Sequence, residues 1–215
     1  MTVQMLRGRG CQSKEARALP AKVALARASE GHHQLDAIAK AFAAVIDAKS
    51  PYTHEHSQRV SGLAVSIGKR LGIKGPALVR LRRAALLHDI GKLGVPNRIL
   101  DKRGSLTAAE WKVVHRHPQF TFEILDRVPM FREFAYDASC HHERLDGSGY
   151  FRQLSGRAIS QTARILAVAD IVDALAAARP YRGGLPTAQI VDMLRAERGS
   201  TLCADCVDAA VDVVD

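Results

Sequence analysis

The 215-residue sequence is short of aromatic side chains, of long apolar runs and of paired cysteines. Aromatic residues make up only 5% while Ala and Leu abound, which favours helices over a β-sandwich. No apolar run approaches the ~18 residues that a membrane-spanning helix needs. The first residues also lack the apolar core of a signal peptide. These absences predict no membrane span and favour a cytoplasmic location.

Cysteines are too few and too scattered for a thiolate site. Of four, only Cys203 and Cys206 have the spacing of a ligand pair, and no second pair accompanies them. A zinc ribbon needs two such pairs, and a thioredoxin site needs a βαβ context that is missing here. We therefore expect reduced thiols without a structural role.

Negative charge is also scarce, and the formal net charge is +9. Residues 1–30 carry six Lys or Arg against two Glu, so we expect a basic N-terminal arm or short helix there. Residues 31–215 are expected to form one domain. A basic balance favours anionic partners. Without interleaved aromatics or a helix-turn-helix signature, a phosphorylated small molecule is favoured over a nucleic-acid polymer.

Apolar residues recur at helical spacing along most of the chain, and no strand pattern is found. The sequence thus predicts an all-α fold, a single helical bundle with its chemistry in the core. The helices bearing candidate site residues are expected at 53–71, at 77–90 with Gly91 as the C-terminal cap, from the capping box of Thr107 and Glu110 to His117, at 130–142, and from the Ser160 cap to 177.

Histidines and aspartates occur within or at the ends of these apolar stripes. The run Leu86-Leu87-His88-Asp89 is an example, and a buried carboxylate requires a cation or a metal as its partner. A single such histidine is more often a satisfied core residue. The whole set is larger: His56, His88, Asp89, His117, His141, His142 and Asp170.

Five imidazoles and two carboxylates suffice for two metal centres bridged by Asp89. A mixed His and carboxylate set without thiolate favours Fe, Mn, Zn or Co over Mg or Ca. Two metals about 3.5–4 Å apart can hold a bridging hydroxide and clamp a phosphoryl oxygen for in-line attack. His54 and His115 lie off the ligand directions, and His115 is expected at the surface.

In several motifs the chain resembles the HD-GYP family, a branch of the HD metal-dependent phosphohydrolases that hydrolyse cyclic di-GMP. The resemblance runs from about Leu35 to Val207. Its motifs are Tyr52-Thr53-x-x-His56-Ser57-x-Arg59-Val60, Leu86-Leu87-His88-Asp89-Ile90-Gly91-Lys92, His117-Pro118, His141-His142-Glu143-Arg144-x-Asp146-Gly147-x-Gly149-Tyr150, Ala169-Asp170 and Arg179-Pro180-Tyr181-Arg182. The longest of these, which begins at His141, is the most specific.

The resemblance implies that the seven histidines and aspartates ligate metal. Attack by a metal-bridging hydroxide would open cyclic di-GMP to pGpG, and then possible further cleavage would give GMP. Lys92 would contact the scissile phosphate beside the bridging Asp89. The residues implied in substrate binding are Arg179, Arg182, Gly149 and Tyr150.

Two departures from the family pattern matter. Tyr52 stands where some members have a glutamate for a third metal, so two metals are expected, iron or manganese above others. Phe151 replaces the proline of the Gly-Tyr-Pro signature. Two alternatives to the cyclic di-GMP phosphodiesterase stay open: a catalytically weak cyclic di-GMP-binding or protein-docking signalling module, and an HD hydrolase for another nucleotide. As partners, a homodimer or other signalling proteins stay open.

Overall fold

The computed structural model describes residues 31, 33–49, 55–177 and 183–214. The chain divides into two compact units, 1–37 and 38–215, whereas the sequence placed the division after residue 30. Residues 33–47 are helical across this division. Several predicted features lie outside the described residues: the basic arm, Tyr52, Thr53, His54, Arg179 and Arg182.

The described part of the second unit is built from helices and contains no strand, which confirms the all-α prediction. Two short 3-10 helices interrupt the series, η1 (Ile90–Gly94) and η2 (Gly156–Ala158). None of the described helices has the length and apolar character to cross a bilayer. The α-helices are α2 (His56–Arg70), α3 (Gly75–Leu87), α4 (Asn97–Leu100), α5 (Ala108–Val114), α6 (His117–Asp126), α7 (Arg132–Ser139), α8 (Gln161–Ala176), α9 (Thr187–Glu197) and α10 (Ala204–Val214).

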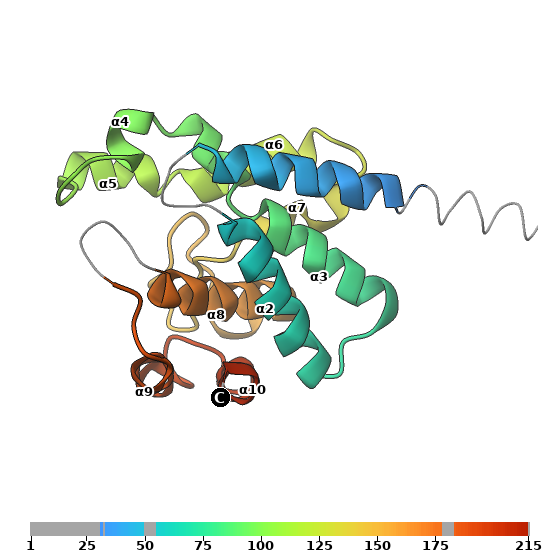
Figure 1. Ribbon diagram of the computed structural model, residues 1–215, viewed down its shortest axis with the longest axis vertical. Coiled ribbons are helices and arrows are strands. Elements are labelled where there is room, and N and C mark those ends of the chain that lie inside the picture. The colour runs from blue at the N-terminus through green and yellow to red at the C-terminus, as the bar shows by residue number, and fades with distance from the viewer. Residues whose placement is uncertain (1–30, 32, 50–54, 178–182, 215) are drawn as a thin grey trace, which may run out of the picture. The chain divides into compact units, whose positions relative to one another are not determined.

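Helix α8 is the central element of the bundle. It packs against α2, α7, α9 and α10, and it lies between the α4–α7 segment and the α9–α10 pair (Figure 1). Ser160 caps its N-terminus, as predicted, by accepting a hydrogen bond from the Ala163 amide at 3.1 Å. Its Ile165, Leu166 and Val168 are fully buried. Burial of this apolar helix supplies much of the driving force for folding.

Three predicted helices have the wrong boundaries, each next to a candidate histidine. Helix α3 ends at Leu87 and not at Ile90, so His88 caps it and Asp89 begins a 3-10 turn. Helix α7 ends at Ser139, before the two histidines. The segment predicted to reach His117 as one helix stops at Val114, and a new helix begins at His117 with proline in its first turn. Proline is favoured there because its missing amide has no helical partner.

Gly91 was predicted to cap α3, but it lies inside η1 and serves close packing. A Cβ at this position would lie 1.9 Å from the His117 carbonyl oxygen and 2.5 Å from the Thr121 amide. Thr121 donates a hydrogen bond to the His88 carbonyl at 2.8 Å and accepts one from the Gly91 amide at 3.0 Å. Helix α6 is therefore pinned against the turn that carries His88 and Asp89.

Candidate metal centre and cleft

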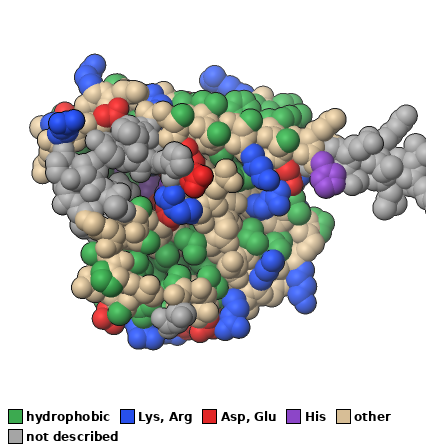
Figure 2. All heavy atoms as spheres, in the orientation of Figure 1, with side chains coloured by type: hydrophobic (Ala, Val, Ile, Leu, Met, Phe, Trp, Pro, Cys, Tyr) green, Lys and Arg blue, Asp and Glu red, His purple; other side chains and the backbone are tan. Residues whose placement is uncertain are grey.

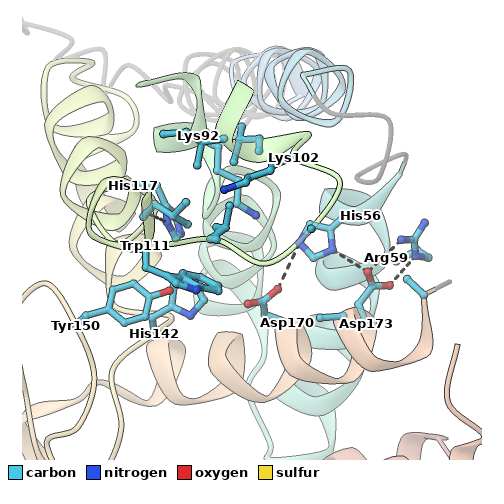
Figure 3. A pocket seen from close by; sticks show the side chains of 17 residues that line it. His56, Arg59, Lys92, Lys102, Trp111, His117, His142, Tyr150, Asp170 and Asp173 are labelled. Carbon is cyan, nitrogen blue, oxygen red and sulfur yellow. Dashed lines mark hydrogen bonds and ion pairs between the residues drawn. The ribbon is translucent and has the colours of Figure 1, made fainter. Parts of the chain in front are cut away.

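The seven histidines and aspartates converge in one place, although they come from α2, the turn after α3, α6, the turn after α7, and α8. Their donor atoms fall into overlapping groups in which all atoms lie within 4.8 Å of one another. The labelled members point into a common cleft (Figure 3). The groups are His117 with His141 and His142, His56 with His88 and Asp170, and His88 with Asp89 and His141.

Backbone carbonyls orient three of the imidazoles. In His88, His117 and His141, Nδ1 lies 2.7–2.8 Å from the carbonyl oxygen of the residue three positions earlier. A carbonyl only accepts hydrogen bonds, so each Nδ1 carries the proton. The Nε2 atoms then keep their lone pairs, and these point toward the aspartates. This is the tautomer that a metal-ligating histidine needs.

His56 is oriented by a side chain that the sequence analysis did not place in the site. Its Nδ1 lies 2.7 Å from an Asp173 carboxylate oxygen, and Asp173 also accepts from Arg59 Nε at 2.6 Å. Asp173 is buried, one turn after Asp170 on α8. The i, i+3 spacing was visible in the sequence, but nothing there indicated that His56 would lie against it.

Asp89 lies at the centre of the cluster. The Nε2 atoms of His56 and His88 are each 3.4 Å from its Oδ2, and that of His117 is 3.3 Å from its Oδ1. Asp89 Oδ1 and His88 Nε2 are buried without a hydrogen-bond partner. Buried lone pairs that face one another are costly unless a cation lies between them. The donor set therefore fits divalent metal ions.

Electrostatics differ between the two sides of the cluster. On one side, the pKa of His56 is raised to about 11, because the carboxylates of Asp170, Asp173 and Asp89 together outweigh the opposing effect of burial. On the other side, burial and neighbouring imidazoles lower the pKa of His141 to about 3. The first side attracts positive charge strongly, and the second offers neutral imidazole lone pairs at ordinary pH.

A cleft of about 370 Å³ opens above this cluster. In the space-filling view a small area of histidine is visible inside a recess, beside acidic and basic side chains (Figure 2). His88, Asp89 and His141 lie beneath it and are at most 2% exposed. The polar and aromatic side chains that line the cleft are His56, Arg59, Lys92, Lys102, Trp111, His117, His142, Tyr150, Asp170 and Asp173.

Lys92, the predicted phosphate contact, lines the cleft and forms an ion pair with Asp89, its Nζ lying 2.5 Å from Oδ2. Although burial opposes it, this lysine and the neighbouring His88 lower the pKa of Asp89 well below its usual range. Asp89 is therefore ionised at neutral pH. The Lys92 ammonium group thus lies directly beside this carboxylate at the edge of the cleft.

Tyr150 lines the cleft, whereas Gly149 is not among its lining residues. A part of either residue in substrate binding stays a prediction. A Cβ on Gly149 would lie 2.5 Å from the Glu143 Cα, so the residue lets its loop close onto the turn after α7. The Tyr150 ring stacks on His142, with centroids 4.6 Å apart. His115 was expected to be a plain surface residue. It is exposed, yet its ring also stacks on Tyr150, with centroids 4.0 Å apart.

Glu143 supports the loop that carries Tyr150, a role that the sequence did not reveal. It is buried, and its carboxylate accepts hydrogen bonds from the amides of Arg152 and Leu154 at 2.9 and 2.8 Å. Both amides lie in the loop that follows Tyr150. The negative charge is thus satisfied by backbone, and the loop is held beside His142.

Residues 40–204 match the family model of the HD domain. The chain belongs to the HD domain family. Over 175 residues this HD protein is 45% identical to 3'3'-cGAMP-specific phosphodiesterase 3 of Vibrio cholerae, covering 81% of this chain and 38% of the relative. Over 159 residues it is 38% identical to a cyclic di-GMP phosphodiesterase of Thermotoga maritima, covering 73% and 43%. The chain therefore spans about two fifths of the length of these relatives.

A solved structure of an HDG"Y"P protein from Bdellovibrio bacteriovorus has the same fold. It superposes with a TM-score of 0.60 at 22% identity, covering 77% of this HD chain and 53% of the other. Together with the phosphodiesterase relatives, this likeness confirms the resemblance to the HD-GYP family. The described cysteines of the HD chain, Cys140, Cys203 and Cys206, are free thiols.

Proposed function

We propose that the chain is a metal-dependent phosphodiesterase domain that hydrolyses a cyclic dinucleotide. The observation that carries the proposal is the buried cluster in which unprotonated Nε2 atoms face two carboxylates, with Asp89 Oδ1 and His88 Nε2 lacking partners. Such a cluster has little use in a domain that only packs against a partner, because burying unsatisfied donors and acceptors destabilises the fold.

Two sets of residues would hold the two metal ions, and Asp89 would contribute to both. One set is His56, His88 and Asp170, and the other is His117, His141 and His142. Two ions of iron or manganese, when bound, supply Lewis acidity to a phosphoryl oxygen and lower the pKa of a water molecule. The backbone carbonyls behind the imidazoles and Asp173 behind His56 hold the donor atoms in place, which limits reorganisation during the reaction.

Lys92 is proposed to stabilise negative charge on the scissile phosphate. Its ammonium group lies in the cleft next to Asp89, so a phosphodiester above the cluster would meet it. A cation fixed at this position stabilises the transition state more than the ground state, because charge builds up on the non-bridging oxygens. Arg179 and Arg182 are proposed to bind substrate phosphate or guanine, and Tyr150 to line the groove.

Cyclic di-GMP, opened to pGpG, is the substrate we propose, and product analysis decides whether cleavage continues to GMP. The 45% identity to a 3'3'-cGAMP-specific enzyme favours 3'3'-cGAMP as a second candidate. Both are cyclic purine dinucleotides with two phosphodiesters, so the metal cluster would act on either in the same way. The choice between them lies in contacts to the bases.

The test is anaerobic purification, loading with Fe or Mn, metal analysis, and product analysis on both cyclic dinucleotides. We expect two metals per chain and a linear dinucleotide as the first product. The Asp89→Asn variant, treated in the same way, is the matched control. A preparation that holds two metals and binds the dinucleotide without cleaving it would make the chain a binding module. Failure to bind either dinucleotide would point to another nucleotide.

A further inference from the structure

Trp111 is the only tryptophan in the chain, and it lies at the mouth of the cleft. It is on α5 and 47% exposed, although indole is among the side chains that gain most from burial. The same residue also lines a shallow neighbouring hollow with Ala108, Lys112 and His115. Trp111 therefore presents aromatic surface at the edge of a polar cleft, where a bound ligand can cover it.

Stacked and tilted rings connect Trp111 with the histidine cluster. The centroids of Trp111 and His115 are 5.4 Å apart, His115 stacks on Tyr150, and Tyr150 stacks on His142. Figure 3 shows Trp111, Tyr150 and His142 together on one side of the cleft. Three successive contacts between aromatic rings therefore connect Trp111 at the mouth with His142, a predicted metal ligand.

The backbone that carries the indole is fixed at the start of α5. The Thr107 side chain accepts from the Glu110 amide, and the Glu110 carboxylate accepts from the Thr107 amide at 2.7 Å. Lys102, another residue at the mouth, donates to the same carboxylate at 2.6 Å. Trp111 follows Glu110 directly, so it is carried on a capped and braced helical turn. A preorganised aromatic platform loses little entropy on binding a flat ligand.

We propose that Trp111 is the stacking platform for one purine base of the dinucleotide while its phosphodiester lies over the histidine and aspartate cluster. The cleft offers two kinds of surface near one another: the cationic side chains of Lys92 and Lys102, which suit phosphate, and the exposed indole, which suits a flat aromatic ring. A nucleotide has the two matching groups, a phosphate and a base. The inference rests on the proposed function, since it names the part of that substrate which the mouth recognises.

Tryptophan fluorescence tests the platform without catalysis. Because Trp111 is the sole tryptophan, emission from the metal-free protein reports on this site alone. We expect saturable quenching by cyclic di-GMP and none by ribose 5-phosphate. Quenching without turnover in the metal-loaded protein would overturn the hydrolase and leave the platform standing. Turnover without quenching would overturn the platform and leave the hydrolase, and the absence of both would overturn both.

Kinetics of variants provide the second test. Trp111→Ala should raise KM for cyclic di-GMP by roughly 10- to 100-fold, the range that loss of one base stack gives, with kcat and metal content within about threefold. Trp111→Phe should recover most of the affinity. Met193→Ala on α9, where the side chain is similarly exposed at 46%, is the matched control and should change neither constant. Unchanged KM in Trp111→Ala would overturn the proposal, as would a loss of metal together with kcat.

Discussion

The floor and the mouth of the cleft are built in different ways. The floor, here His88, Asp89 and His141, is buried, and its imidazoles are oriented by backbone carbonyls. The mouth, here Lys102, Trp111 and His115, is held by side-chain contacts on and around α5. A change in the floor disturbs helix ends and buried charge together, whereas a change in the mouth leaves the core intact. We expect the floor to determine the reaction and the mouth to determine the substrate.

The largest effect should come from Asp89→Asn, which keeps the volume of the floor and removes its charge. A neutral amide cannot compensate the positive charge of Lys92 and of the divalent ions. We therefore expect loss of bound metal and a fall in turnover of at least about 10³-fold. Metal content and turnover should be measured on one preparation. Asp212→Asn, at an exposed ion pair with Arg70, is the control. Retention of both metals would contradict the central position of Asp89.

Lys92→Ala separates catalysis from metal binding at the edge of the floor. Turnover should fall by about 10²-fold, the scale for one lost donor to the transition state. Both metals should stay, and cyclic di-GMP should bind within roughly tenfold of the wild type, about 1.4 kcal/mol. Lys102→Ala, which removes the lysine at the mouth, should mainly change affinity. Near-normal turnover of Lys92→Ala with intact metals would exclude the catalytic role.

Asp173→Asn tests the support behind His56. The variant weakens the charged hydrogen bond that sets the His56 tautomer, so metal affinity should fall about 10- to 100-fold, with turnover recovering at high metal concentration. Competition with a chelator of known affinity measures this directly. Asp208→Asn, at the exposed ion pair with Arg198, provides the comparison. Equal metal affinity in the two variants would mean that Asp173 only stabilises the fold.

His115→Ala should have the smallest effect. The variant removes the ring that stacks on Tyr150, and such a contact is worth about 0.5–1.5 kcal/mol. Because Tyr150 is then less firmly held in the cleft, KM should rise roughly two- to tenfold, with metal content unchanged. Lys112→Ala, in the last turn of α5 before His115 and also exposed, should leave KM at the wild-type value. Loss of metal in His115→Ala, the result expected for Asp89→Asn, would show that the mouth also contributes to metal binding. The division of roles between floor and mouth would then be wrong.

Much of the fold and of the candidate cluster could be predicted from the sequence because the signals are local or chemical. The capping box of Thr107 and Glu110 and the Ser160 cap involve residues three apart, so their formation needs no distant partner. Helical periodicity sufficed for the all-α class. The seven histidines and aspartates stood out because their residue types, in an apolar setting, suit one kind of chemistry.

The tertiary structure alone decided where the helices break around that cluster and what supports it. Apolar periodicity continues through Ile90, so it could not reveal that α3 ends at Leu87. That turn is held by Thr121 on a helix thirty residues away and by close packing that only glycine permits at position 91. Asp173 likewise reaches His56 only because α8 packs on α2. The residue types determine which chemistry the cluster can perform. The geometry of the cluster depends on packing between helices that are distant in the sequence, and no local pattern in the sequence reveals that packing.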